Sequence, residues 1–425
     1  MLARPSTLRT RVIQRWVTLN GFSSDAVLYL FSSLFALVLG WTSGQVAQWH
    51  WGYLAVAPYL AAGVVALILG RLRLKRATAA RIALLVLVIF GAVVVPLGLE
   101  TRWRHQDPEM GFAQPEVSVI ERSATYVSEG KDPYRSYYVD GRLVDKVPGL
   151  PAYESFFPYF PLMSVFGLPS AETHEGSGLT DARIVMSLMT LLASSAALML
   201  LRASRQKKIR VAQVLLALPT GALFLSTGGD DMPILALMLL GVAALQRRSN
   251  NVAGVSLGVA AAMKLTAWPL AAGALLVARD GNGKSAWRRV AAWVVAIVVV
   301  TITPFAWNDP WSFFSNVFAF PLGLAGVASP AASALPGHIL TTWWAPFGHV
   351  LAPLTFLVGG YFAAKYAKRH WPLSLSQLLA MLSLVYLVMM CVASATRIGY
   401  IIYPINFALW SWVCSDRVER EPVLI

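Results

Sequence analysis

The chain has 425 residues, of which 57% are hydrophobic and only 13% are charged. Soluble domains are about half apolar and about a quarter charged, so this composition predicts that a lipid bilayer surrounds most of the chain. The formal net charge of +14 could suggest a nucleic-acid partner. However, Lys and Arg gather in short segments between apolar runs, as topology signals do. We therefore expect a polytopic membrane protein that binds membrane lipid and no nucleic acid.

Apolar segments of about the length that crosses a bilayer recur along the whole chain. They lie near 26–43, 53–70, 82–99, 182–201, 211–226, 232–246, 252–278, 288–305, 347–364, 373–393 and 398–414. The basic N-terminal segment is followed by an apolar stretch too long for a signal-peptide core, so we expect a retained first span. Basic clusters in the short connections are expected to stay cytoplasmic. Counted from a cytoplasmic N-terminus, every cluster through Arg248 falls inside.

The segment 252–278 conflicts with this pattern, because basic residues flank it on both sides. Lys264, Thr266 and Pro269 interrupt its middle, which predicts two short helices folded back as a hairpin. The alternative is one long helix with Lys264 buried, which would cost a few kcal/mol and break the positive-inside pattern. With the hairpin, the chain has about 11–13 transmembrane helices, both termini are cytoplasmic, and the loops 100–181 and 306–346 lie outside.

The loop 100–181 gathers carboxylates in an otherwise acid-poor protein. Within it, Ser118 to Glu129 can form an amphipathic helix. Glu116 follows Pro115 directly, and a carboxylate fixed at a helix start suits a general base. An equally weighted interpretation is that Glu116 only favours the positive N-terminus of the helix, which is worth under ~1 kcal/mol. Glu121 is a secondary candidate that otherwise belongs to a solvated face.

The sequence Gly228-Gly229-Asp230-Asp231 predicts a tight turn followed by a helix. Asp231 is favoured as the N-cap of that helix, with Pro233 in its first turn. Adjacent acids beside glycines can also bind the hydroxyl groups of a sugar or a divalent cation. Asp230, which is not needed as a cap, is the better candidate for that role.

Three cations fall in apolar or small-residue surroundings near the outer membrane surface: Lys264, His338 and Arg397. Ionisable residues within membrane segments are often functional, and three cations at this level suggest a site for a lipid phosphate. The alternatives are snorkelling of Lys264 and Arg397 to headgroups and an ordinary interfacial histidine at 338. Tyr400 is more typical of an aromatic belt than of a sugar-stacking platform.

The order of these motifs resembles glycosyltransferase family 87, the polyprenol-phosphate-mannose-dependent mannosyltransferases of the GT-C fold, and in particular its actinobacterial members. In that family an acid opens the first large outer loop, followed by a small-residue pair, a glycine and a Pro-Tyr or Leu-Tyr. The matching residues here are Glu116, Ser123-Ala124, Gly130 and Asp132-Pro133-Tyr134. The Gly-Gly-Asp-Asp turn and the segments GVSLGVAAAMKLTAWP, ASALPGHIL and TRIGYIIYPINF also look like the family. One departure is that the family acid is usually Asp, whereas Glu116 has a longer arm.

The resemblance implies one all-α polytopic membrane domain over 1–425, a GT-C-like bundle whose extracytoplasmic loop carries short amphipathic helices. It implies inverting transfer of a hexose, mannose in the family, from a polyprenyl-phosphate donor to an envelope glycolipid or glycan at the outer face of the plasma membrane. Neither a metal nor another cofactor is expected. The implied roles are general base for Glu116, donor-phosphate binding for Arg397, Lys264 and His338, and sugar or acceptor binding for Asp230, Asp231, Glu121, Tyr134 and Tyr400.

Two other classes of function remain open from the sequence. A flippase or transporter of lipid-linked sugars would also use many helices and buried cations, and a non-catalytic scaffold of envelope assembly would need no active site. A flippase is expected to place charges along a transmembrane path, whereas the charges here gather at one face. The acidic loop 100–181 therefore favours the transferase.

Overall fold

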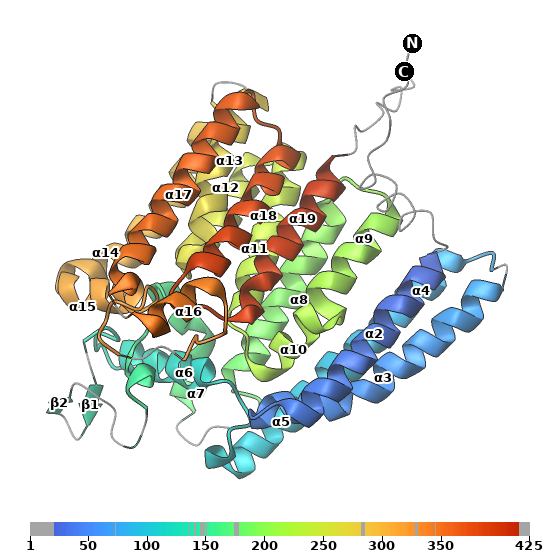
Figure 1. The fold of residues 1–425 in the computed structure, drawn as a ribbon, viewed down its shortest axis with the longest axis horizontal. Coiled ribbons are helices and arrows are strands. Elements are labelled where there is room, and N and C mark those ends of the chain that lie inside the picture. Colours follow the sequence, from blue (N-terminus) through green and yellow to red (C-terminus); the bar gives the residue numbers. More distant parts are fainter. Residues whose placement is uncertain are drawn as a thin grey trace. The chain divides into compact units, whose positions relative to one another are not determined.

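The structure is a computed structural model that describes residues 21–72, 74–135, 137–139, 142–144, 149, 151–173, 178–281, 285–327, 330–344 and 346–415. The basic N-terminal cluster of the sequence lies outside these residues. The chain forms two compact units, one of Met1–Phe112 with Ser204–Thr227 and the other of Ala113–Ala203 with Gly228–Ile425. Helices build both units (Figure 1). We call them the first and the second unit and describe each by itself.

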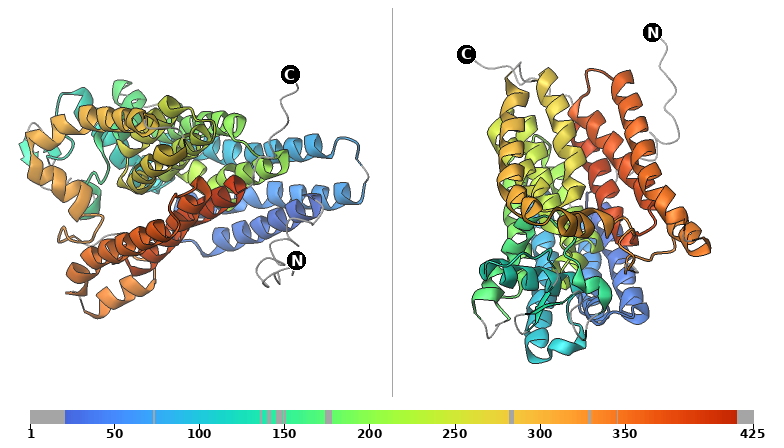
Figure 2. Two further views of the ribbon diagram at one scale, coloured as in Figure 1. Left: turned by 90° about the horizontal axis from the view of Figure 1, so that it is seen from above. Right: turned by 90° about the vertical axis from the view of Figure 1, so that its left-hand side faces the viewer.

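The first unit is an all-helical bundle. Its helices are α2 (Gly21–Thr42), α3 (Val46–Arg71), α4 (Ala77–Ile89), α5 (Val95–Gln106), α9 (Arg205–Ala212) and α10 (Pro219–Thr227), with π-helical turns joining α4 to α5 and α9 to α10. Helices α2 and α3 run side by side in all views (Figures 1 and 2). A Cβ on Gly52 would lie 2.5 Å from the backbone nitrogen of Gly40. Small residues therefore let these two backbones approach closely, as is common between membrane helices.

The second unit contains the remaining helices and a small hairpin of two strands. Its elements are α6 (Pro115–Ser128), β1 (Tyr137–Val139), β2 (Arg142–Val144), α7 (Leu168–Glu172), α8 (Ala182–Leu200), α11 (Asp231–Gln246), α12 (Asn250–Ala261), α13 (Trp268–Gly281), α14 (Ala286–Asn308), α15 (Pro310–Phe314), α16 (Pro336–Trp343), α17 (Phe347–Arg369), α18 (Leu375–Val392) and α19 (Ile402–Cys414). The strands pair antiparallel, with Tyr138 opposite Leu143. The short elements α6, α7, α15 and α16 gather at one end of the long helices (Figures 1 and 2).

Many of the helices have the length and composition of membrane spans. Seven described helices are long and apolar enough to cross a membrane: Gly21–Thr42, Val46–Arg71, Ala77–Gln106, Ala182–Leu200, Arg205–Thr227, Ala286–Asn308 and Leu375–Val392. Three shorter helices are also apolar, and large apolar side chains such as Phe31, Val300 and Leu357 are exposed. Apolar exposure on this scale fits a lipid environment. The predicted fold class, a helical polytopic membrane protein, is confirmed.

The helical path between α12 and α13 is interrupted at Lys264. Helix α12 ends at Ala261, and a 3₁₀ turn over Leu265–Ala267 precedes α13. The two helices contact each other, and both pack against α14. The interruption places Lys264 at a turn of the backbone and not inside a continuous helix.

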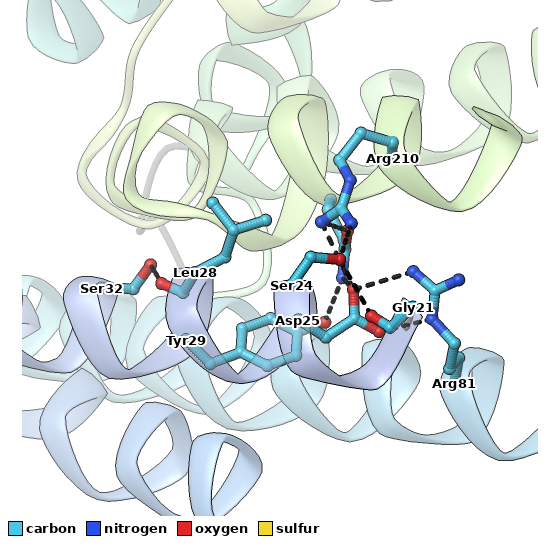
Figure 3. A network of polar contacts seen from close by, with 9 residues as sticks. Gly21, Ser24, Asp25, Leu28, Tyr29, Ser32, Arg81 and Arg210 are labelled. Atoms are coloured by element: carbon cyan, nitrogen blue, oxygen red, sulfur yellow. Dashed lines mark hydrogen bonds and ion pairs between the residues drawn. The ribbon is translucent and has the colours of Figure 1, made fainter. Parts of the chain in front are cut away.

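A buried network of charged and polar side chains joins three segments of the first unit (Figure 3). Asp25 on α2 accepts hydrogen bonds from Arg81 Nε and Nη2 at 2.5 and 2.8 Å. Arg210 Nη1 lies 3.3 Å from Asp25 Oδ1, and Gln213 Nε2 donates to the same oxygen at 3.0 Å. Tyr29 accepts a further hydrogen bond from Gln213. The Asp25 carboxylate, 1% exposed, thus has partners on both oxygens.

Candidate functional site

Helix α6 begins at Pro115, three residues before the expected Ser118, and the missing N–H of Pro115 in the first turn leaves no unpaired donor. The helix buries Val117, Ile120 and Ala124 on one face. Glu116 lies in the first turn, beside this buried face, and its side chain is only 18% exposed. The carboxylate is therefore held at the edge of the packed core.

Glu116 forms an ion pair with Arg397, which is 281 residues away in the sequence. Arg397 Nη1 lies 2.5 Å from Glu116 Oε1, and the side chains are 31% and 18% exposed. The second carboxylate oxygen, Glu116 Oε2, is buried and has no hydrogen-bond partner among the described residues. A buried polar atom without a partner is costly and rare, so it marks a position where another group can bind.

The backbone around Arg397 is fixed by the segment that precedes α16. Thr396 N donates to Ala331 O at 2.8 Å, and Ser333 N donates to Thr396 O at 2.9 Å. Ile398 N donates to Ser333 Oγ at 2.9 Å. These bonds hold the residues on both sides of Arg397, so its guanidinium extends from a rigid segment.

A second cluster of charges forms around Lys264. Its Nζ lies 2.6 Å from Asp230 Oδ2 and 2.5 Å from Asp231 Oδ1, and it also faces the ring of Tyr159 at 5.4 Å from the centroid. Among the described residues, no group of three or more His, Cys, Asp or Glu could hold a metal ion. The Lys264 ammonium lies between the two aspartate carboxylates, in the position that a bound divalent cation would take.

The interpretation of Asp231 as the N-cap of α11 is wrong. The N-cap position belongs to Asp230, whose side chain makes no capping hydrogen bond, and Asp231 is the first residue of the helix. The carboxylates turn toward Lys264 because a buried ammonium requires opposite charges nearby. Burial raises the pKa of Asp230 to about 6, while Lys264 acts in the opposite direction.

The glycine turn packs directly against α6. Gly228 has a φ of +103°, and a Cβ at this position would lie 2.2 Å from Val117 Cγ2. A side chain is therefore disfavoured both by conformation and by space. This contact places the Asp230–Asp231 turn next to the residue that follows Glu116.

The turn at Lys264 is also attached to the loop 100–181. Phe160 N donates to Met263 O at 3.0 Å, and the ring of Phe160 stacks on Trp268 at 5.5 Å. Both bonded residues are nearly fully buried. The backbone before Lys264 is therefore held by a segment more than a hundred residues earlier in the chain.

The two charge clusters belong to one constellation within the second unit. Asp230 lies within electrostatic range of Glu116 as well as of Lys264. Tyr400 lies within range of both Lys264 and Arg397. The structure therefore brings together six of the residues singled out from the sequence: Glu116, Asp230, Asp231, Lys264, Arg397 and Tyr400. We call this set the polar constellation.

The other three predicted site residues form hydrogen bonds with residues outside the polar constellation. His338 on α16 contacts Ser394 O through Nδ1 at 3.0 Å. Glu121 Oε1 accepts from Ala182 N at 3.0 Å, at the start of α8. Tyr134 is 2% exposed, and its hydroxyl donates to Tyr159 O at 2.7 Å. A turn is present at Asp132, with Asp132 Oδ1 accepting from Tyr134 N.

Sequence reasoning assigned no role to two residues that contact the constellation. Tyr403 donates to Asp231 Oδ1 at 2.6 Å, and Thr266 Oγ1 lies 2.7 Å from the Tyr403 hydroxyl. A tyrosine at this place in the sequence is more typical of an aromatic belt at the membrane surface. The only signal in the sequence is that Thr266 lies two residues after a charged residue in an apolar segment.

Comparisons with known proteins give one matching family model and solved structures with limited similarity to this chain. The model of glycosyltransferase family 87 matches residues 157–395, a range that includes Lys264 and both aspartates but neither Glu116 nor Arg397. The chain is similar to ArnT from Cupriavidus metallidurans bound to undecaprenyl phosphate, at 19% identity and a TM-score of 0.45, covering 80% of this chain and 60% of that chain. The same protein in the apo state is 16% identical to this chain, with a TM-score of 0.44, and the match covers 80% of this chain and 59% of that chain. The chain spans about 60% of the length of these structures. No curated protein matches the sequence.

Proposed function

This chain belongs to glycosyltransferase family 87, and on that premise we propose that it transfers a hexose from a polyprenyl-phosphate donor to a glycolipid or glycan acceptor. We propose mannose as the hexose, because the motifs around Glu116 and Lys264 resemble mannosyltransferases. We place the reaction at the outer face of the plasma membrane, since the basic connections are expected inside. Nucleotide sugars are cytoplasmic, so an outward-facing transferase requires a lipid-linked donor.

The observation that carries the proposal is the state of the two Glu116 oxygens. Oε1 is paired with Arg397, which fixes the direction of the carboxylate. Oε2 is buried and has no partner among the described residues. A general base must come within hydrogen-bonding distance of the proton that it removes. Glu116 Oε2 is thus oriented and available for an acceptor hydroxyl.

The proposed reaction is a single inverting displacement at the anomeric carbon of the hexose. The acceptor oxygen forms a bond to this carbon while the bond from the carbon to the phosphate oxygen breaks. The hydroxyl proton passes to Glu116 Oε2, and the bonding electron pair leaves with the phosphate. Because the leaving group departs as an anion, no general acid is required.

Arg397 and Lys264 are proposed to stabilise the charge that develops on the departing phosphate. The guanidinium of Arg397 offers several donors in a fixed plane, and the ammonium of Lys264 acts as a point charge. Both are more than two-thirds shielded from solvent, where fixed charges act more strongly than in water. Within the constellation three carboxylates face these two cations, and we assign Asp230 and Asp231 to binding sugar hydroxyls as well.

Replacement of Glu116 by Gln tests the base. Gln keeps the size and one oxygen but cannot accept the proton, so the transfer rate is expected to fall about 10²- to 10⁴-fold. The measurement is turnover of radiolabelled polyprenyl-phosphate mannose by reconstituted protein in the presence of native lipid extract. Glu129→Gln is the matched control, because Glu129 lies at the end of α6 and its exposed side chain pairs with Lys131.

The outcomes separate the base from the reaction class. Undiminished turnover by Glu116→Gln, with normal turnover by the control, would exclude Glu116 as the base. If the wild-type protein moves the labelled lipid between leaflets and transfers no sugar, it is a flippase. If it does neither with any acceptor in the extract, the transferase assignment fails.

A further inference from the structure

Tyr403 contacts the charged cluster of Lys264 through Asp231. It is the second residue of α19 and is 1% exposed. Its hydroxyl is 2.6 Å from Asp231 Oδ1 and 2.7 Å from Thr266 Oγ1. Lys264 Nζ contacts the same Asp231 oxygen at 2.5 Å. One carboxylate oxygen thus accepts from a phenol and from an ammonium.

The chemistry of the groups fixes the direction of these hydrogen bonds. An ionised carboxylate only accepts, so the single proton of Tyr403 is donated to Asp231. The Tyr403 oxygen is then free to accept, and Thr266 Oγ1 must be its donor. Hydrogen bonds to a charged acceptor are shorter and stronger than neutral ones. The chain from Thr266 through Tyr403 therefore fixes the orientation of the Asp231 carboxylate.

The Tyr403 ring is held in place by α18. It stacks on Tyr386 with 5.4 Å between centroids and 15° between planes. The Tyr386 hydroxyl in turn donates to the backbone carbonyl of Thr266. The turn that carries Lys264 is thus attached to both α18 and α19. Lys264 and Asp231 have little freedom to separate.

We infer that Tyr403 is a positioning residue that keeps the Asp231 carboxylate aimed at Lys264, so that the ammonium is fixed for the phosphate of a lipid-linked donor. This inference rests on the proposed function. Tyr403 is buried and acts through Asp231. Loss of its hydroxyl leaves Asp231 with one donor fewer, so the cluster takes up a proton more readily and holds Lys264 less firmly.

Tyr403→Phe and Tyr386→Phe form a matched pair. Each removes one buried hydroxyl and keeps the stacked rings, but only the first removes a bond to a carboxylate. For Tyr403→Phe we expect the donor KM to rise about tenfold to a hundredfold and kcat to change by less than about threefold. The acid limb of the kcat/KM profile should move to higher pH, whereas the profile of Tyr386→Phe should stay in place.

The pH profile must be interpreted together with the other titratable groups near Tyr403 and Asp231. These are Asp230, Lys264, Tyr159, Tyr386 and Tyr400. The double variant Asp231→Asn with Tyr403→Phe identifies the group responsible. If Tyr403 acts through Asp231, adding Tyr403→Phe to Asp231→Asn changes the donor KM no further.

Binding of undecaprenyl phosphate, measured by a shift in the unfolding temperature, separates this inference from the proposed function. If the wild-type protein binds this lipid and Tyr403→Phe binds it equally well with the same pH dependence, the positioning role is wrong. If the wild-type protein does not bind it, the lipid-linked donor itself is wrong. Equal shifts of the acid limb in both Phe variants would also exclude the role of Tyr403, because they would reflect general loosening.

Discussion

The two units contain buried charge clusters that differ in how completely their hydrogen bonds are made. In the first unit, both oxygens of Asp25 are occupied, by two bonds from Arg81 and by contacts from Arg210 and Gln213. In the second unit, Arg397 occupies one oxygen of Glu116, and the other oxygen has no partner among the described residues.

This difference separates the structural role of the Asp25 network from the function proposed for Glu116. A closed network specifies how helices pack, and every bond in it is already made in the absence of a ligand. An open oxygen inside a partly shielded site adds nothing to stability until another group binds. The sequences of the two clusters give no sign of this distinction, since both combine acids with arginines.

The largest expected effect on stability comes from removing the carboxylate of the Asp25 network. Asp25→Ala leaves the charges of Arg81 and Arg210 without their buried counter-ion, which is expected to cost about 3–5 kcal/mol of unfolding free energy. The measurement is thermal unfolding in detergent. Ser32→Ala is the control, because its buried hydroxyl bonds Leu28 O within the same helix. Normal stability of Asp25→Ala would contradict a structural role for this network.

A smaller effect is expected from the pH dependence of the open site. Burial raises the pKa of Asp230 from 3.8 to about 6, so the folded state favours the protonated form. The stability contributed by this group is complete below about pH 4 and is lost as the pH rises through about 6. The wild-type unfolding temperature should therefore fall by about 1–2 °C between about pH 5 and 7.5.

Asp230→Asn should remove this fall, since Asn carries no titratable group and retains an oxygen for Lys264. Glu129→Gln, which changes an exposed acid on α6, should leave the fall unchanged. A decline as steep in Asp230→Asn as in the wild type would show that another group in the constellation titrates.

The smallest effect on stability is expected from Glu121, which lies on α6 about one and a half turns after Glu116. Glu121 Oε1 accepts from Ala182 N at the start of α8, and Gln would keep an oxygen there while removing the charge. Glu121→Gln is therefore expected to cost about 0.3–1 kcal/mol of unfolding free energy, the value of a charge at a helix N-terminus. Chemical denaturation measures it. A loss of several kcal/mol would show that Glu121 behaves as a buried charge, like Asp25.

The helices could be predicted from the sequence because their signals are local. The apolar segment 182–201 corresponds to α8, and Pro115 marks the start of α6 within three residues of the expected Ser118. Helix formation in a membrane depends on length and apolarity. Both can be counted along the chain.

The contacts within the site could not be predicted in the same way. Glu116 and Arg397 were each singled out, but nothing local indicates that residues 281 positions apart form an ion pair. The capping rule failed at Asp231 because Lys264 provides a stronger partner than the helix N-terminus. Tyr403 was missed because a tyrosine at a membrane surface and one bonded to a carboxylate look alike in sequence.

The hydrogen bond from Phe160 N to Met263 O has a consequence for engineering this enzyme class. Exchanging the loop 100–181 between relatives would change the surroundings of Glu116 while keeping the long helices. That exchange would also replace the residue that fixes the backbone before Lys264, and with it the stacking partner of Trp268. A chimaera must therefore carry its own Met263–Trp268 turn, or the backbone that positions Lys264 will change as well.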